Sequence, residues 1–155
     1  MPVAMALMTG TYTKQFDRKG RVSVPAALRN LLLPENATEF KVRPVPDELA
    51  LEALTLGELE EQYSIIKTRL AIGSEEWDDA IEEYISSAKS VTPDAEGRII
   101  LPPDFREHIG ETEEVTFVGR GTTMRIWAAD AYTAFKAKPR SGKRKPLPTA
   151  GEVGA

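Results

Sequence analysis

The sequence predicts an α+β protein in which one small structural unit occurs twice. A short pattern recurs along the chain, β-type alternation surrounds each copy, and helical periodicity fills the segment between the copies. The first copy is residues 17–25, Asp-Arg-Lys-Gly-Arg-Val-Ser-Val-Pro, and the second is residues 94–102, Asp-Ala-Glu-Gly-Arg-Ile-Ile-Leu-Pro. A repeat this widely spaced is typical of a duplicated domain rather than of an array of short stacked units.

The first copy predicts a β-hairpin followed by a short helix. Residues 11–16 and 21–24 alternate polar with apolar or aromatic side chains, as half-buried strands do. Between them, Asp17 can bond the downstream backbone and Gly20 can accept a positive φ, so both are expected to build the turn. The proline that follows suits the first turn of a helix, which we expect over residues 26–32.

A strand pair and two amphipathic helices are expected next. Residues 39–43 and 48–51 are short β-type runs separated by prolines. Thr55 is a suitable N-cap, and Glu58 stands at the capping-box position three residues later. Apolar residues then recur at helical spacing, and Ser74 is the expected start of the second helix.

The second copy predicts the same order of elements. A strand at residues 87–91 leads into a turn built by Asp94 and Gly97, and a return strand follows at residues 98–101. A short helix is expected up to Ile109. The remaining elements are a strand pair at residues 114–119 and 124–127 and a helix through residues 128–135.

Composition excludes several classes of function. The chain has 155 residues and contains no cysteine, which excludes a disulfide framework, a thiolate nucleophile and a cysteine-ligated zinc site. Its one histidine, His108, has no partner acid or nucleophile at a fixed spacing, so we expect it to be a surface residue. No phosphate-binding loop and no membrane-length apolar run occur. An enzyme is therefore the least favoured class, and we expect no metal, no cofactor, no small-molecule substrate and no membrane partner.

The formal net charge of −4 hides an uneven distribution of charge. Residues 14–29 are basic, residues 47–83 are acidic, and residues 136–145 are basic again. Acids adjacent in sequence do not share a helix face, so the paired acids predict a solvated helical surface rather than a metal site or acid–base catalysis. These paired acids are Glu60, Glu61, Glu75, Glu76, Asp78, Asp79, Glu82 and Glu83.

The repeated order of strand, Asp-x-x-Gly-Arg turn, apolar strand, proline and arginine-containing helix resembles the swapped-hairpin domain of the AbrB/SpoVT group of bacterial transcription factors. Two copies joined by helices resemble the MraZ family, and the likeness covers roughly residues 8–135. The resemblance implies duplicated swapped-hairpin β-barrel halves that interleave within one chain. The implied parts are a loose extension at residues 1–7, halves at residues 8–54 and 87–135, a helical linker at residues 55–86, and a disordered basic tail at residues 136–155.

The same resemblance implies a function. The chain would be a sequence-specific transcriptional regulator of a division and cell-wall gene cluster. It would bind repeated promoter boxes in double-stranded DNA, assemble into a ring-like homo-oligomer, and act in the cytoplasm at the nucleoid. An antitoxin-like protein-interaction module is the alternative, although two hairpin copies and a tail of low apolar content favour it less.

The candidate DNA-binding residues lie mainly in the first copy. A β-ribbon fits the major groove, and arginine can bind guanine O6 and N7 together. The alternative for Arg21 and Arg98 is a structural ion pair with Asp17 and Asp94, and Arg98, which lacks basic neighbours, is expected to be structural or secondary. The basic tail could add non-specific DNA affinity or solubility, with neither favoured. The candidate DNA-binding residues are Lys14, Arg18, Lys19, Arg21 and Arg98.

Overall fold

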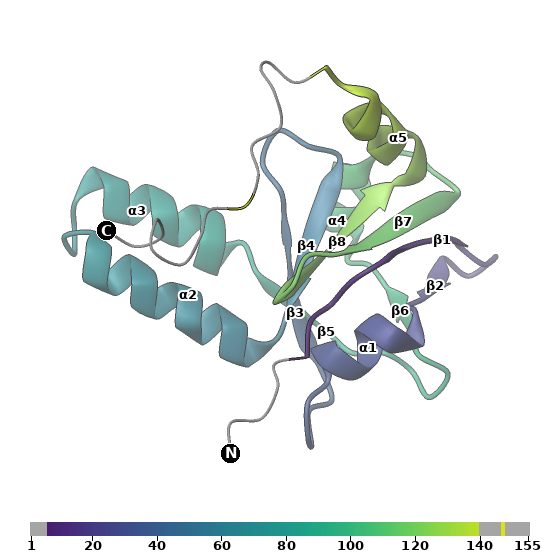
Figure 1. Ribbon diagram of the computed structural model, residues 1–155, viewed down its shortest axis with the longest axis horizontal. Helices are drawn as coiled ribbons and strands as arrows, with labels where there is room; N and C mark the ends of the chain where they lie inside the picture. The colour runs from purple at the N-terminus through teal and green to yellow at the C-terminus, as the bar shows by residue number, and fades with distance from the viewer. Residues whose placement is uncertain (1–5, 140–146, 148–155) are drawn as a thin grey trace.

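The computed structural model describes residues 6–139 and Leu147, and it confirms an α+β fold (Figure 1). The strands are β1 (Thr11–Gln15), β2 (Arg21–Ser23), β3 (Phe40–Pro44), β4 (Ala50–Leu54), β5 (Lys89–Val91), β6 (Arg98–Ile100), β7 (Glu114–Gly119) and β8 (Thr123–Ala128). The helices are α1 (Ala26–Leu32), α2 (Leu56–Arg69), α3 (Glu75–Ile81), the π-helix η1 (Glu82–Ser86), α4 (Pro103–Ile109) and α5 (Ala129–Ala137).

Four of the strand pairings join the two repeats, and the pairings β3–β4 and β7–β8 each lie within one repeat. A six-stranded sheet has the order β1-β7-β8-β4-β3-β5, and β2 and β6 form a separate two-stranded sheet. All of these pairings are antiparallel. Exchanging each strand for its counterpart in the other repeat gives the same order read from the opposite end. Each repeat therefore supplies half of the strands of both sheets.

The expected hairpin between residues 11–16 and 21–24 is wrong as a strand pair. β1 pairs with β7, while β2 pairs with β6, so the two limbs of the turn enter different sheets. The Asp17 N–H still donates to the Arg21 carbonyl at 2.8 Å, which closes the turn. The second copy behaves alike, because β5 pairs with β3 and β6 with β2. In the β2–β6 pair the central side chains of the two strands, Val22 and Ile99, are buried, each 1% exposed.

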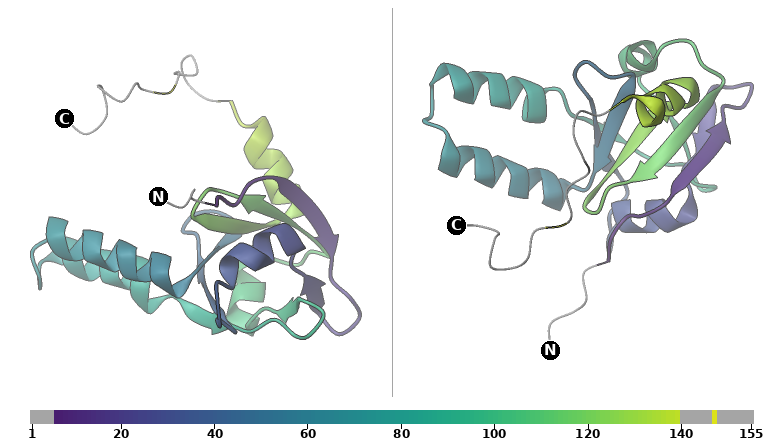
Figure 2. Two further views of the ribbon diagram at one scale, coloured as in Figure 1. Left: turned by 60° about the horizontal axis from the view of Figure 1, so that its bottom comes forward. Right: turned by 45° about the horizontal axis from the view of Figure 1, so that its top comes forward.

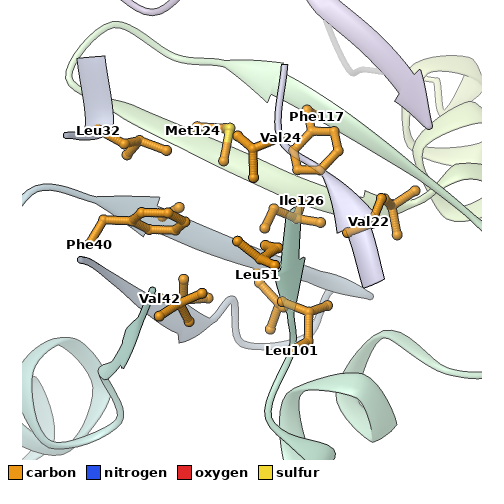
Figure 3. Packing of buried hydrophobic residues seen from close by; sticks show 14 of the residues in the cluster. Val22, Val24, Leu32, Phe40, Val42, Leu51, Leu101, Phe117, Met124 and Ile126 are labelled. Carbon is orange, nitrogen blue, oxygen red and sulfur yellow. The ribbon is translucent and has the colours of Figure 1, made fainter. Parts of the chain in front are cut away.

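The hydrophobic core lies between the six-stranded sheet, the β2–β6 pair and the short helices α1 and α4. Figure 3 shows side chains from both repeats meeting there, including Val22, Phe40 and Ile126. Leu28 and Phe105 hold equivalent places in the two repeats, and both are buried. Burying each such side chain stabilises the fold by about 1.5–3 kcal/mol, so the two repeats are held together mainly by this shared core.

The helices α2, α3 and η1 form a helical arm (residues 56–86) that projects away from the β2–β6 pair (Figures 1 and 2). Thr55 is the N-cap of α2, as expected, and its hydroxyl accepts from the Glu58 N–H at 3.0 Å. Ser74 caps α3 in the same way, accepting from the Trp77 N–H at 3.1 Å. The paired acids of the arm are all exposed, as the sequence predicts.

A buried arginine joins the helical arm to the sheet. The Arg43 side chain on β3 is 4% exposed, and its Nη2 donates to Glu52 on β4 at 2.5 Å and to Gln62 on α2 at 2.6 Å. Its Nη1 donates to the Tyr84 carbonyl in η1 at 2.8 Å. One guanidinium therefore bonds three elements, and because a buried charge is costly without such partners, it fixes where the arm leaves the sheet. No local pattern in the sequence distinguishes this arginine from the others.

The structure differs from the sequence-based predictions at His108, at Pro25 and at the end of α5. His108 is half-buried, and its Nε2 lies 3.0 Å from the Val45 carbonyl, so it is not a free surface residue. Pro25 is the N-cap of α1 rather than its first helical residue. α5 continues through Ala137, into the range assigned to the tail, and most of that tail and of the N-terminal extension lies outside the described residues. No described helix has the length and apolar character needed to cross a membrane.

Candidate nucleic-acid interface

The β2–β6 pair forms a two-stranded ribbon with one buried face and one outward face. Val22 stands opposite Ile99 in the register, and both side chains point into the core. Because successive side chains of a strand alternate between faces, the residues on either side of this central pair share the outward face. Arg21 stands there opposite Ile100, and Ser23 opposite Arg98. The outward face of the ribbon therefore carries Arg21, Ser23, Arg98 and Ile100.

The turn at residues 17–20 is held by its aspartate. One carboxylate oxygen of Asp17 accepts from the backbone N–H groups of Lys19 and Arg21, both at 2.9 Å. The other accepts from Arg21 Nε at 2.7 Å. Gly20 has φ 78°, a left-handed conformation that glycine adopts without strain. The turn thus fixes the Arg21 guanidinium by one edge.

The turn at residues 94–97 repeats this hydrogen bonding. Asp94 accepts from the N–H groups of Glu96 and Arg98 at 3.0 and 2.9 Å, and from Arg98 Nε at 2.9 Å. Gly97 has φ 80°. The sequence offered a structural alternative for the two arginines, namely ion pairs with the aspartates of their turns. Both ion pairs, Arg21–Asp17 and Arg98–Asp94, are present.

These bonds also hold the two carboxyl groups in their charged form. The Arg21 backbone N–H, followed by its side chain, lowers the pKa of Asp17 below the ordinary 3.8. The Arg98 backbone N–H and side chain lower the pKa of Asp94 in the same way. Both aspartates are therefore ionised at neutral pH and keep the arginines oriented.

The two turns differ in what remains free for a ligand. Only Nε of Arg21 is hydrogen-bonded within the described chain, so both of its Nη groups can donate elsewhere. In the second turn Arg98 Nη2 donates to Glu96 at 2.9 Å, so the guanidinium is held on two sides. The first turn also carries the exposed Arg18 and Lys19.

Arg18, Lys19 and Arg21 belong to the first turn and to the strand that follows it, while Lys14 and Arg98 lie on the strands β1 and β6. Lys14 on β1 is exposed and precedes the turn, and Arg21 begins the ribbon that follows the turn. Arg98, expected in a separate hairpin, shares the outward face with Arg21 because β6 is the partner of β2. Ile100, which was not among the residues predicted from the sequence, is 64% exposed on the same face. Val22 and Ile99 are the apolar residues at equivalent positions of the two copies. Pairing them as buried partners would have placed Arg98 and Ile100 on the outward face with Arg21.

Two other arginines at equivalent places in the repeats are used for structure. Arg29 on α1 donates from Nη1 to the Val24 carbonyl at 2.9 Å and lies directly against Gly97. Arg106 on α4 stacks over the Phe16 ring, 3.4 Å from its centroid. Burial lowers the pKa of Arg106. Neither side chain belongs to the outward face.

An acidic hollow borders the basic turn. It has a volume of about 920 Å³ and lies between α4 and the start of β7. The Phe16 N–H donates to the Glu113 carbonyl at 2.9 Å, which brings the hollow next to the end of β1. Within the described residues no cluster of His, Asp or Glu is arranged to hold a metal ion. The acidic residues of the hollow are Glu107, Glu111, Glu113, Glu114 and Asp130.

Comparison with known proteins gives consistent matches over most of the chain. The family model described as "MraZ protein, putative antitoxin-like" matches residues 84–148. A relative from Gluconacetobacter diazotrophicus, "Transcriptional regulator MraZ", is 33% identical, and the match covers 95% of each chain. A relative of the same name from Parvibaculum lavamentivorans is 34% identical over 88% of this chain and 84% of its own. A third, from Gluconobacter oxydans, is 33% identical over 90% and 87%.

Proposed function

This chain belongs to the MraZ family, and from that membership we propose that it is a transcriptional regulator that binds double-stranded DNA through the β2–β6 ribbon and the basic turn at residues 17–20. The observation that supports this most directly is the state of Arg21. Its Nε is fixed by Asp17 while both Nη groups remain available on an outward ribbon face. A family of transcriptional regulators is not an enzyme class, and the proposal includes no catalysis.

The chemistry of the ribbon suits the major groove of DNA. A two-stranded ribbon fits a groove about 12 Å wide, and the paired Nη groups of an arginine can donate to guanine O6 and N7. Lys14, Arg18 and Lys19 would contact phosphates on either side and release counterions. The acidic hollow beside β1 would repel the DNA backbone and so limit the direction in which the duplex can run.

The finer features of the proposal follow from the family resemblance. We propose that the repeats are swapped-hairpin halves, and the exchange of strand partners between them supports this. We also propose repeated promoter boxes in a division and cell-wall gene cluster as the target, and a ring-like homo-oligomer, acting at the nucleoid in the cytoplasm, as the binding species. A single turn offers few cations, so several copies on evenly spaced boxes would supply affinity through multivalency.

The test is binding of the full-length chain to the region upstream of its own gene, with Arg21→Ala as the variant. Loss of a bidentate base contact is expected to weaken binding about 10- to 100-fold. Arg98→Ala is the matched control, because it removes the same side chain from the equivalent position and is expected to weaken binding less. A gel shift at several salt concentrations measures both. Unchanged affinity and salt dependence for Arg21→Ala would show that the proposed contact is wrong.

The family description also keeps an antitoxin-like role open as a second candidate. In that case the chain would cap a protein partner, and its surface acids rather than the ribbon would contribute most of the contacts. Purification of the chain from its native cells distinguishes the two roles. A stoichiometric second protein that survives high salt would favour the antitoxin-like role, whereas recovery with DNA that is lost at high salt would favour the regulator.

A further inference from the structure

We infer that Ile100 reads DNA sequence by contacting the methyl group of a thymine in the major groove, beside the base pair that Arg21 contacts. This inference rests on the proposed DNA-binding function and adds a specificity-determining residue to it. It assigns part of the target chemistry, namely a thymine next to the guanine.

Among the described residues, Ile100 lies outside the hydrophobic core and is exposed to solvent. Its side chain is 64% exposed, whereas its neighbours Ile99 and Leu101 are 1% and 4% exposed. It does not belong to the hydrophobic core cluster. In the first repeat the equivalent position on the ribbon is Ser23, which shows that the ribbon forms equally well with a small polar residue there.

The register places Ile100 where it can act together with Arg21. The two residues stand directly opposite each other across the ribbon, so their Cβ atoms are about 5 Å apart. Base pairs in duplex DNA are stacked about 3.4 Å apart, so two such side chains can reach neighbouring pairs. Arginine donors match guanine, and an aliphatic side chain matches the thymine methyl group, which only the major groove presents.

A second copy of the chain is a less suitable partner for this face. Ile100 is surrounded by Arg21 and Arg98, and each arginine keeps part of its guanidinium exposed. Pairing two copies through the outward faces would bring four guanidinium groups together around one pair of isoleucines. Like-charge repulsion at that distance opposes association, whereas DNA brings the opposite charge.

The experiment compares thymine with deoxyuracil, which lacks only the methyl group. Duplexes from the upstream region that the chain binds in the gel shift are synthesised with single T→dU replacements. They are titrated with wild-type protein and Ile100→Ser at constant salt. At one position the wild type is expected to lose about fourfold in affinity, the value of one buried methyl group. Ile100→Ser is expected to bind the thymine duplex more weakly and to show no difference between the two bases there.

Two controls keep the test specific. Ile100→Val retains a branched aliphatic group and should keep most of the discrimination. Ile72→Ser removes another highly exposed isoleucine, 74% exposed between α2 and α3, and should leave discrimination unchanged. Circular dichroism and the mass in solution are measured for every variant.

The outcomes separate this inference from the proposed function. If the wild type binds every dU duplex as tightly as its thymine parent while Arg21→Ala still weakens binding, the role of Ile100 is overturned and the DNA-binding function stands. If Arg21→Ala has no effect, the proposed Arg21 contact is wrong, and if the wild type does not bind the upstream duplex at all, the proposed function itself is wrong. If Ile100→Ser changes the mass in solution but leaves thymine discrimination unchanged, Ile100 belongs to a contact between copies, and the inference is overturned.

Discussion

The turns at residues 17–20 and 94–97 share the same hydrogen bonds but differ in the charge of their two middle residues. In each, one aspartate accepts from two backbone N–H groups and from the Nε of the following arginine, and a glycine takes a positive φ. Around this common skeleton the first turn carries Arg18 and Lys19, and the second carries Ala95 and Glu96. Both repeats share the hydrogen bonds that build the turn, and under the proposed function the two variable positions give only the first turn the positive charge to bind an anion.

The glycines of the two turns also differ in how closely the rest of the protein packs against them. Gly97 is buried beneath Arg29, and its carbonyl accepts from the Val24 N–H at 3.0 Å. Gly20 is more open, and a Cβ there would meet no other atom within 4 Å. Gly97 is thus packed against the rest of the protein and Gly20 is not, while the other three residues of both turns are exposed. Under the proposed function, the second copy therefore contributes mainly to the stability of the fold, and the first copy contacts DNA.

Exchanging the variable residues between the turns is expected to have the largest effect. Arg18→Ala with Lys19→Glu removes two cations and adds an anion, so DNA affinity should fall about 100-fold at 0.1 M salt. The log–log dependence on salt should become shallower by about 2. Ala95→Arg with Glu96→Lys should instead strengthen binding, because it also frees Arg98 Nη2. Equal effects of the two exchanges in a salt-dependent titration would contradict the proposed asymmetry.

Gly20→Ala and Gly97→Ala test whether the second turn is packed more closely than the first. Each substitution places a Cβ at a positive φ, which costs about 1 kcal/mol. At Gly97 the Cβ also displaces Arg29 and its bond to the Val24 carbonyl, so the total should reach about 3 kcal/mol. Urea unfolding measures both free energies.

Removing Arg29 provides the control for this prediction. In an Arg29→Ala background the clash is absent, so Gly97→Ala should then cost only about as much as Gly20→Ala. If the cost at Gly97 stays the same with and without Arg29, the difference between the glycines has another origin.

The sequence predicted most elements because their signals are local. The alternation of Thr11 to Phe16, the N-cap at Thr55 and the glycine after Ile109 each act within a few residues. The local patterns did not predict the exchange of strand partners, which only the family resemblance implied, because a strand's alternation shows which face is buried but not which strand lies beside it. A tight turn between two strands was read as a hairpin, whereas burial of Val22 and Ile99 together is achieved by pairing β2 with β6.

The candidate site was predicted in part for the same reason. The sequence alone predicts one basic surface in the first copy, because its cations are close together in the chain. These cations are Lys14, Arg18, Lys19 and Arg21. Arg98 and Ile100 reach that surface only through the long-range register of the ribbon. The Arg43 network was missed because a single arginine among β-type residues gives no sign of its partners, which come from β4, α2 and η1.

The smallest expected effect concerns the aspartates, where the two turns should behave alike in stability and differently in DNA binding. The pKa of both Asp17 and Asp94 is lowered from 3.8 in the folded chain, so their contribution to stability is present above that value and is lost as the pH falls through the folded pKa. Asp17→Asn and Asp94→Asn should therefore each flatten the acid limb of the stability curve, and to a similar extent. At neutral pH Asp17→Asn should also weaken DNA binding, because it loosens Arg21, and Asp94→Asn should not. Urea unfolding between pH 2 and about pH 6 measures the first effect, with Asp78→Asn on the helical arm as the exposed control. A stability change confined to one turn would show that the shared skeleton is not equally important in both repeats.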